Sequence, residues 1–257
     1  MTANTPFKIK GSVALVTGAN RGLGKCFVEA LIERGAERVY ACARKPENLQ
    51  LLVDKLGARV VALELDVTNP DQVNNAVQKA DDVSLLINNA GVLGSKGLVE
   101  ANNLDTLTQE MDVNVYGLAR MCLAFAPVLK RNDGGAILNI LSVASLYPFA
   151  PFGSYSASKA AAMSLTQSLA YELRDQGTQV SGTYAGYIDT GMVDHINGDK
   201  VSPDDVAHAS LDGIEAGKDE MDTDDRSQAI RALRSEGGDA IRDAYWYRAD
   251  EFRKDHA

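Results

Sequence analysis

The sequence contains few cysteines and no long apolar run. Its three cysteines, Cys26, Cys42 and Cys122, are far apart, form no CxxC pair and lie in apolar contexts, which favours free thiols. The N-terminus has no apolar signal-like stretch, and no window reaches the roughly 18 uninterrupted apolar residues of a membrane span. We therefore expect a cytoplasmic protein that has no membrane partner.

Positive charge is also scarce. The chain has 26 Lys and Arg against 35 Asp and Glu, a formal net charge of -9, so it lacks the basic surface that neutralises nucleic-acid phosphates. The three histidines show no metal-ligand spacing, and the acidic run at 219–225 lacks the glycine and distal glutamate of a calcium loop. We expect neither a nucleic-acid partner nor a metal ion.

Short apolar runs rich in β-branched residues recur along the chain, with helix-length segments between them. Strands that are apolar almost throughout are typical of a parallel sheet whose two faces are both covered by helices. The sequence thus predicts an α/β fold, a Rossmann-like doubly wound parallel sheet, and no linker divides residues 1–257 into more than one domain. The six runs are Ser12 to Thr17, Arg38 to Ala43, Arg59 to Leu65, Val83 to Asn88, Gly135 to Leu141 and Gln179 to Tyr184.

The pattern is looser in the last quarter of the chain. Residues 187–200 have the composition of a loop, and Ser202 after it can cap a helix that begins at Pro203. A short last strand is possible at Glu220 to Asp222. The tail, residues 223–257, has helical spacing that is broken at 237–238 by two glycines.

A glycine-rich turn follows the first expected strand directly. Gly18, Gly22 and Gly24 lie between this strand and a helix, where glycine permits a tight bend and brings backbone N–H groups and the helix N-terminus close to a phosphate. A nucleoside-triphosphate loop does not fit, because Ala19 stands at the position of its first glycine and Cys26 replaces the Ser or Thr that binds Mg²⁺. The turn therefore predicts a dinucleotide cofactor.

Two arginines indicate which dinucleotide is preferred. At the end of the second strand, about 20 residues beyond the glycines, an NAD site has an acidic residue, whereas an NADP site has an arginine for the 2′-phosphate. This chain has Arg44 there, and Arg21 within the turn adds a second planar donor group. We expect a preference for NADP(H).

Tyr155 and Lys159 are four residues apart at the start of an alanine-rich helical segment. Hydride transfer to a carbonyl requires a proton donor, and tyrosine, with a pKa of about 10 in water, acts more easily when that pKa is lowered. Side chains at i and i+4 share a helix face, so we expect Lys159 to lower the pKa of Tyr155.

Together these motifs resemble the short-chain dehydrogenase/reductase family over nearly the whole chain, to about residue 225. Seven markers occur in the family's order, and Ser142 precedes Tyr155 by the usual interval. One departure is Ala185, where the family commonly has proline before Gly186. The markers are TGANRGLG at 17–24, DV at 66–67, NNAG at 88–91, Asn114 in DVNVYG, Ser142 in NILSVAS, YSASK at 155–159 and AGYIDT at 185–190.

The resemblance implies a catalytic tetrad. In it Tyr155 is the general acid and base, Ser142 binds the substrate oxygen, Lys159 assists Tyr155 and holds the nicotinamide ribose, and Asn114 anchors a relay water. It also implies a set of cofactor-binding residues. These are Gly18, Asn20, Arg21, Gly22, Leu23, Gly24, Arg44, Asp66, Val67, Asn88, Ala90, Gly91, Tyr155, Lys159, Gly186, Ile188 and Thr190.

The substrate is expected between the nicotinamide and the loop 187–200, which resembles the family's variable lid. The candidate walls are mainly apolar, so we expect a hydrophobic or aryl ketone, or its secondary alcohol. Helical segments at 106–129 and 155–174 resemble those through which the family forms homodimers and homotetramers. A non-catalytic NADP sensor on the same fold is the alternative. The candidate walls are Leu93, Val143, Ala144, Tyr147, Phe149, Phe152 and Met192.

Overall fold

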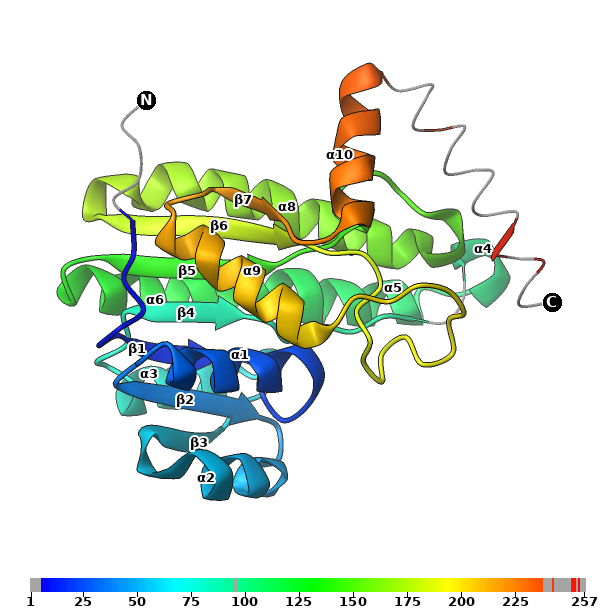
Figure 1. The fold of residues 1–257 in the computed structure, drawn as a ribbon. Helices are drawn as coiled ribbons and strands as arrows, with labels where there is room; N and C mark the ends of the chain where they lie inside the picture. The colour runs from blue at the N-terminus through cyan, green and yellow to red at the C-terminus, as the bar shows by residue number, and fades with distance from the viewer. Residues whose placement is uncertain (1–5, 95–96, 238–241, 243–250, 253, 255–257) are drawn as a thin grey trace.

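Seven parallel strands form one sheet in the computed structural model, which describes residues 6–94, 97–237, 242, 251–252 and 254. The strand order is β3-β2-β1-β4-β5-β6-β7, and all neighbouring strands run parallel (Figure 1). The bounds are β1 Val13–Val16, β2 Arg38–Ala43, β3 Val60–Glu64, β4 Leu85–Asn88, β5 Gly135–Ile140, β6 Thr178–Tyr184 and β7 Glu220–Asp222. The predicted doubly wound sheet is confirmed, and the six apolar runs and the short last strand agree with it to within two residues at each end.

Helices cover both faces of the sheet, as the apolar strands require. One layer contains α1 (Gly22–Glu33), α2 (Gln50–Leu56) and α9 (Pro203–Glu215), and the other contains α3 (Pro70–Lys79), α6 (Leu118–Arg131) and α8 (Gly153–Leu173). In β1, Ala14 and Val16 pack toward the first layer, whereas Val13 and Leu15 pack toward the second. Successive strand residues point to opposite faces, so a strand buried on both sides, such as β1, is apolar at nearly every position.

The chain reverses its winding direction between β1 and β4, which are neighbours in the sheet. In open α/β sheets, ligands bind at such a switch point, outside the carboxyl ends of the strands. The loops after β1, β4, β5 and β6 all reach this edge of the sheet (Figure 1).

A long helical rod runs from Asp105 to Arg131 and changes its winding in the middle. It comprises α5 (Asp105–Glu110), a π-helical segment η3 (Met111–Gly117) and α6. By length and mean hydropathy, 1.2, this rod could cross a membrane, but half of its most apolar window is buried. Its contacts with α3 and α8 account for that apolar character.

The remaining helices are short or lie near the end of the described chain. They are α4 (Leu98–Ala101), α7 (Val143–Leu146), α10 (Asp225–Glu236) and the single 3-10 turns η1 (Pro46–Leu49), η2 (Gly57–Arg59), η4 (Ala150–Phe152) and η5 (Arg174–Gln176). Ser202 caps α9 as predicted, since its side chain accepts hydrogen bonds from the backbone N–H groups of Asp204 and Asp205. The helix α10 ends before Gly237, as the sequence predicts, while the second glycine of the predicted break, Gly238, and most of the tail lie outside the described residues.

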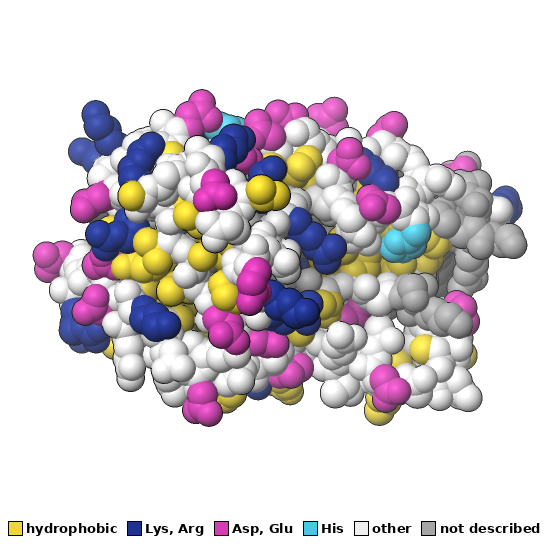
Figure 2. All heavy atoms as spheres, turned by 90° about the horizontal axis from the view of Figure 1, so that it is seen from below, with side chains coloured by type: hydrophobic (Ala, Val, Ile, Leu, Met, Phe, Trp, Pro, Cys, Tyr) yellow, Lys and Arg dark blue, Asp and Glu magenta, His cyan; other side chains and the backbone are white. Residues whose placement is uncertain are grey.

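On the face of the molecule seen from below, basic and acidic side chains are interspersed, and hydrophobic side chains show between them where the surface is hollowed (Figure 2). A protein that binds a nucleic-acid backbone presents a continuous basic surface. This face has no such surface.

Candidate active site

A cavity of about 1040 Å³ lies at the carboxyl edge of the sheet, over the switch point. Cavities that bind a drug-sized ligand have volumes of about 300–1,000 Å³, so this one has room for a dinucleotide together with a small substrate. Its walls come from the glycine turn, the ends of β2 to β6, the loop after β6 and α10.

The glycine turn forms one end of the cavity. Gly18 and Gly22 have φ of 64° and 53°, the left-handed region that favours glycine. A Cβ on Gly24 would lie 2.3 Å from the carbonyl oxygen of Gly18, so only glycine fits. No side chain caps the start of α1, and its first turn contains no acidic residue. Its N–H groups and the positive end of its dipole therefore suit an anion.

Thr17 and Asn89 fasten this turn to the end of β4. The Thr17 hydroxyl oxygen accepts hydrogen bonds from the backbone N–H groups of Asn89 and Ala90, both at 2.9 Å. The Asn89 side-chain amide donates to the carbonyl oxygens of Thr17 and Gly18, at 2.9 and 3.2 Å. Sequence reasoning missed this pair, although Asn89 lies within the NNAG motif.

Asn88 does not line the cavity, contrary to the sequence prediction. It is 5% exposed, and its amide donates to the Asn139 side-chain oxygen at 2.9 Å and to the Cys122 sulfur at 3.3 Å. Asn88 is the last residue of β4 and points into the core layer, while Asn89, just beyond the strand, lines the cavity. The other residues of the expected cofactor set do line the cavity.

Arg21 and Arg44 are both exposed at the glycine end of the cavity. Neither forms an ion pair with an acidic side chain within the described part of the chain. Asp66, by contrast, is engaged locally, because one carboxylate oxygen accepts hydrogen bonds from the backbone N–H and the hydroxyl of Thr68 at 2.9 and 2.7 Å. The end of β2 thus brings the positive charge of Arg44 to the cavity.

Ser142, Tyr155 and Lys159 meet at the other end of the cavity. Ser142 follows β5 and caps α7, where its hydroxyl oxygen accepts a hydrogen bond from the N–H of Ala144 at 3.1 Å. Tyr155 and Lys159 project from successive turns of α8, and the Lys159 ammonium nitrogen lies 5.8 Å from the centre of the Tyr155 ring.

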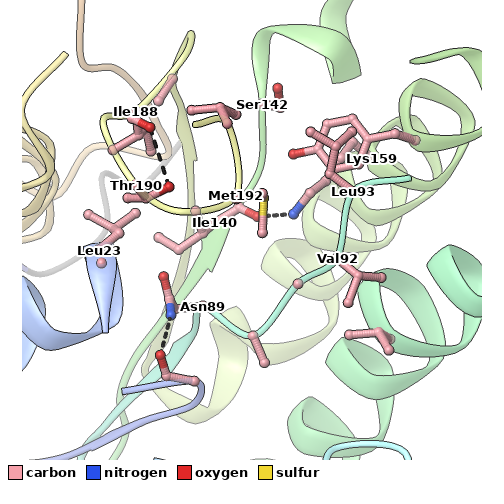
Figure 3. Close-up of a pocket in the computed structure, with 18 of the residues that line it drawn as sticks. Leu23, Asn89, Val92, Leu93, Ile140, Ser142, Lys159, Ile188, Thr190 and Met192 are labelled. Carbon is pink, nitrogen blue, oxygen red and sulfur yellow. Dashed lines mark hydrogen bonds between the residues drawn. The ribbon is translucent and has the colours of Figure 1, made fainter. Parts of the chain in front are cut away.

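The expected lowering of the Tyr155 pKa is wrong for this structure. Burial raises the pKa of Tyr155 to about 12, although a hydrogen bond with Ser142 lowers it, and the negative charge of Glu110 raises it further. Lys159 does not offset this, because its ammonium group donates to the carbonyl oxygen of Ile140 at 2.7 Å (Figure 3). Burial also lowers the pKa of Lys159 to about 8.

Asn114 lies behind this end of the cavity rather than in its wall. It is 2% exposed and sits in the π segment η3. Its side-chain oxygen accepts from the N–H of Val92 at 2.9 Å, and its amide donates to the Val92 carbonyl at 2.9 Å and to the Ser158 hydroxyl at 3.0 Å. Asn114 thus joins the loop after β4 to α8.

Most of the expected substrate walls line the cavity; they are Leu93, Val143, Ala144, Phe149, Phe152 and Met192. Tyr147 does not, and packs instead against the core layer that contains α6 and α8. Phe252 was missed, because no motif marks the tail. Its ring lies 5.7 Å from that of Phe149 and 5.3 Å from that of Phe152, edge to face in both pairs. The three rings form an aromatic wall.

The segment 187–200 contains no helix or strand of its own, apart from a bridge between Ile188 and Val201. Val193 and Ile196 are buried and pack with Phe152, while Met192 is 40% exposed and faces the cavity. Just before it, the N–H of Gly186 donates to the Asp224 carboxylate at 2.8 Å, which ties the segment to α10.

No group of three or more potential metal ligands occurs among the residues that the structure describes.

A Rossmann-like sheet with a glycine turn at its switch point defines the chain as a nucleotide-binding α/β protein. The model of the short chain dehydrogenase family matches residues 12–201. The curated 3-oxoacyl-(acyl-carrier-protein) reductase FabG of Vibrio cholerae is 31% identical over 82% of this chain and 84% of its own length. The chain therefore belongs to the short-chain dehydrogenase/reductase family.

Solved structures agree with this assignment. A short chain dehydrogenase from Burkholderia cenocepacia in complex with NADP is 40% identical, with a TM-score of 0.83 over 89% of this chain and 94% of that one. A short chain dehydrogenase/reductase from Burkholderia phymatum in complex with NAD is 29% identical, with a TM-score of 0.81 over 90% and 95%.

Proposed function

We propose that this protein is an NADP(H)-dependent reductase of hydrophobic or aryl ketones that uses Tyr155 as its proton donor. One observation carries the proposal: Ser142, Tyr155 and Lys159 gather at one end of a cavity whose other end is an uncapped helix N-terminus flanked by two arginines. Such an arrangement suits a phosphate at one end and a reacting carbonyl at the other.

The residues present fit NADP(H). Gly18, Gly22 and Gly24 leave room for a pyrophosphate against α1, and Arg21 and Arg44, free of ion pairs within the described chain, suit a 2′-phosphate. The NADP reported for the Burkholderia cenocepacia protein supports this choice over the NAD of the less similar Burkholderia phymatum protein. When bound, the nicotinamide supplies the hydride in reduction or accepts it in oxidation.

The protein's own groups supply the proton and the polar contacts. With a pKa of about 12, Tyr155 keeps its proton at neutral pH and can donate it to an oxygen that becomes an alkoxide. Ser142 hydrogen-bonds the same oxygen, and Lys159 provides a positive charge beside it. The aromatic wall formed by Phe149, Phe152 and Phe252 supports a flat, apolar substituent on the ketone.

A second candidate is the reduction of a 3-oxoacyl thioester, which the name of the Vibrio cholerae relative suggests. It is the same chemistry on a longer, linear substrate. A panel that contains aryl ketones, aliphatic ketones and a 3-oxoacyl thioester, followed by NADPH absorbance, separates the two candidates.

The matching control is Tyr155→Phe. We expect this variant to bind NADPH but to lose at least about 10²-fold in kcat/KM, because the ring remains and the acid is removed. Full activity of Tyr155→Phe would refute the mechanism. A wild-type protein that binds NADPH yet reduces nothing in the panel would favour a sensor instead.

We further propose that the protein forms a homo-oligomer through η3, α6 and α8. Tyr116, Leu123 and Tyr171 on these elements are 54%, 72% and 68% exposed, so this helical layer offers large apolar side chains to a second copy. Light scattering tests this, and a monomer would contradict it.

The three cysteines form no disulfide, which supports the proposal of a reducing, cytoplasmic location.

A further inference from the structure

Glu110, the last residue of α5, is buried without a full set of partners. It is 1% exposed, and one carboxylate oxygen accepts a hydrogen bond from the backbone N–H of Gly94 at 2.8 Å. The second oxygen is buried and has no hydrogen-bond partner within the described chain. Buried polar groups are nearly always hydrogen-bonded, so an exception in a native fold requires an explanation.

Accepting one N–H bond does not explain a carboxylate at this position. A glutamine has the same length and presents the same kind of oxygen to Gly94, and it does not require the desolvation of a negative charge. The acidic residue is therefore the costlier choice for a purely structural contact. The charge is the feature of Glu110 that the contact with Gly94 leaves unaccounted for.

The segment after β4 is pressed onto α5 and η3 at two points. A Cβ on Gly94 would lie 2.1 Å from the Thr106 methyl group, so the backbone contacts the helix directly there. Two residues earlier, Val92 makes two hydrogen bonds to the Asn114 side chain. Glu110 and Asn114 are thus the two anchors of the segment 92–94.

Leu93 lies between these anchors in the chain and lines the same cavity as Lys159 (Figure 3). Its side chain also packs with Phe152 and Val193, which belong to the substrate side of the cavity. Anchoring on both sides fixes where Leu93 stands relative to the reacting groups.

Glu110 also acts on the reacting groups through its charge. Its carboxylate is close enough to Tyr155 to raise the pKa of that phenol. Within the described chain, Tyr155 on α8 is a titratable group on which the charge of Glu110 acts. On the rod itself, the acid Asp112 is paired with Arg120 at 3.0 Å. The segment 92–94 contributes no titratable side chain.

We propose that Glu110 is a positioning residue for the reaction: its buried carboxylate anchors the segment that carries Leu93 and holds a negative charge behind Tyr155. This inference rests on the proposed role of Tyr155 as the proton donor. The charge keeps the proton on Tyr155 until the substrate oxygen takes it, and the anchor keeps the substrate wall in place.

Two variants separate the charge from the anchor. Glu110→Gln keeps the acceptor for Gly94 and removes the charge. We therefore expect the Tyr155 phenol, titrated by ultraviolet difference absorbance against Tyr155→Phe, to ionise at lower pH by on the order of one unit, with KM for ketone reduction within about twofold. Glu110→Leu removes both, so we expect the same change in the Tyr155 titration and, in addition, a KM raised by about fivefold or more.

Asp105→Asn is the matched control, because it removes the same charge from the exposed start of α5. Its Tyr155 titration should coincide with that of the wild type. An unchanged Tyr155 titration in Glu110→Gln would overturn the charge role, and an unchanged KM in a folded Glu110→Leu would overturn the anchor. Thermal melts establish folding, and Glu110→Gln remains informative if Glu110→Leu does not fold. These outcomes differ from failure of the proposed function, in which the wild type itself is inactive or Tyr155→Phe is active.

Discussion

Replacing Lys159 with methionine measures the cost of burying its ammonium group. Lys159 is 6% exposed, and burial lowers its pKa from the ordinary value of 10.5 to about 8. At neutral pH the folded protein therefore holds a cation that would be better solvated in the unfolded chain. The interval between the two pKa values corresponds to about 3 kcal/mol at pH 7. Methionine keeps an apolar stem of similar length and removes the charge.

We expect Lys159→Met to raise the free energy of unfolding at pH 7 by about 2 kcal/mol, after about 1 kcal/mol is subtracted for the lost hydrogen bond to Ile140. The direction in which wild-type stability changes with pH follows from the lowered pKa of Lys159. The folded protein releases this proton near pH 8 and the unfolded chain only near 10.5, so wild-type stability gains as pH rises through that window. At pH 10 the burial of Lys159 costs the wild type about 1 kcal/mol or less, so Lys159→Met should no longer be more stable than the wild type.

Urea denaturation at pH 7 and pH 10, without cofactor, checks this prediction, since a bound cofactor would add stability of its own. Lys130→Met, at an exposed lysine near the end of α6, is the control and should show no pH-dependent difference from the wild type. The reasoning is refuted if Lys159→Met is equally destabilised at both pH values. A stabilised Lys159→Met should still lose reductase activity, because stability and catalysis make opposite demands on this residue.

Three further predictions concern the cavity walls. Arg44→Asp should lower kcat/KM with NADPH by about 10- to 100-fold and leave NADH less affected, which parallel cofactor titrations would measure. Phe252→Ala should raise KM for aryl ketones by about threefold to tenfold while small aliphatic ketones change little; equal effects on both would argue against the aromatic wall. Gly24→Ala should weaken NADPH binding and lower the melting temperature, because the added Cβ would lie 2.3 Å from the Gly18 carbonyl oxygen, and calorimetry with and without NADPH would detect both changes.

The sheet and the glycine turn were predictable because they depend on local patterns. Strands that are mostly apolar on both faces and glycines at a strand end leave few alternatives. Asn88 and Asn89 show the limit of this reasoning, since both belong to the same motif and only the end of the strand decides which one faces the cavity. Motif membership alone carries no information about side-chain direction.

Other features depend on contacts between distant segments. Phe252 reaches the cavity from the end of the chain, and its partners lie about a hundred residues earlier. The Tyr155 pKa was predicted from helical spacing to Lys159, but burial and the charge of Glu110 determine its direction. Spacing along a helix gives proximity, whereas a pKa also depends on desolvation, which only the packed structure reveals.

The π segment between α5 and α6 changes which side of the rod faces inward from one half of the rod to the other. An α-helix advances by about 100° per residue, and a π turn, with its i to i+5 bonds, takes up an extra residue without breaking the rod. On the N-terminal side of η3, Glu110 faces the segment 92–94. On its C-terminal side, Met121 and Phe125 face the sheet. Loss of one residue from Met111–Gly117 would turn one half of the rod relative to the other by about that angle. The chain length of this short stretch is therefore constrained by the core and the cavity together, whatever its side chains.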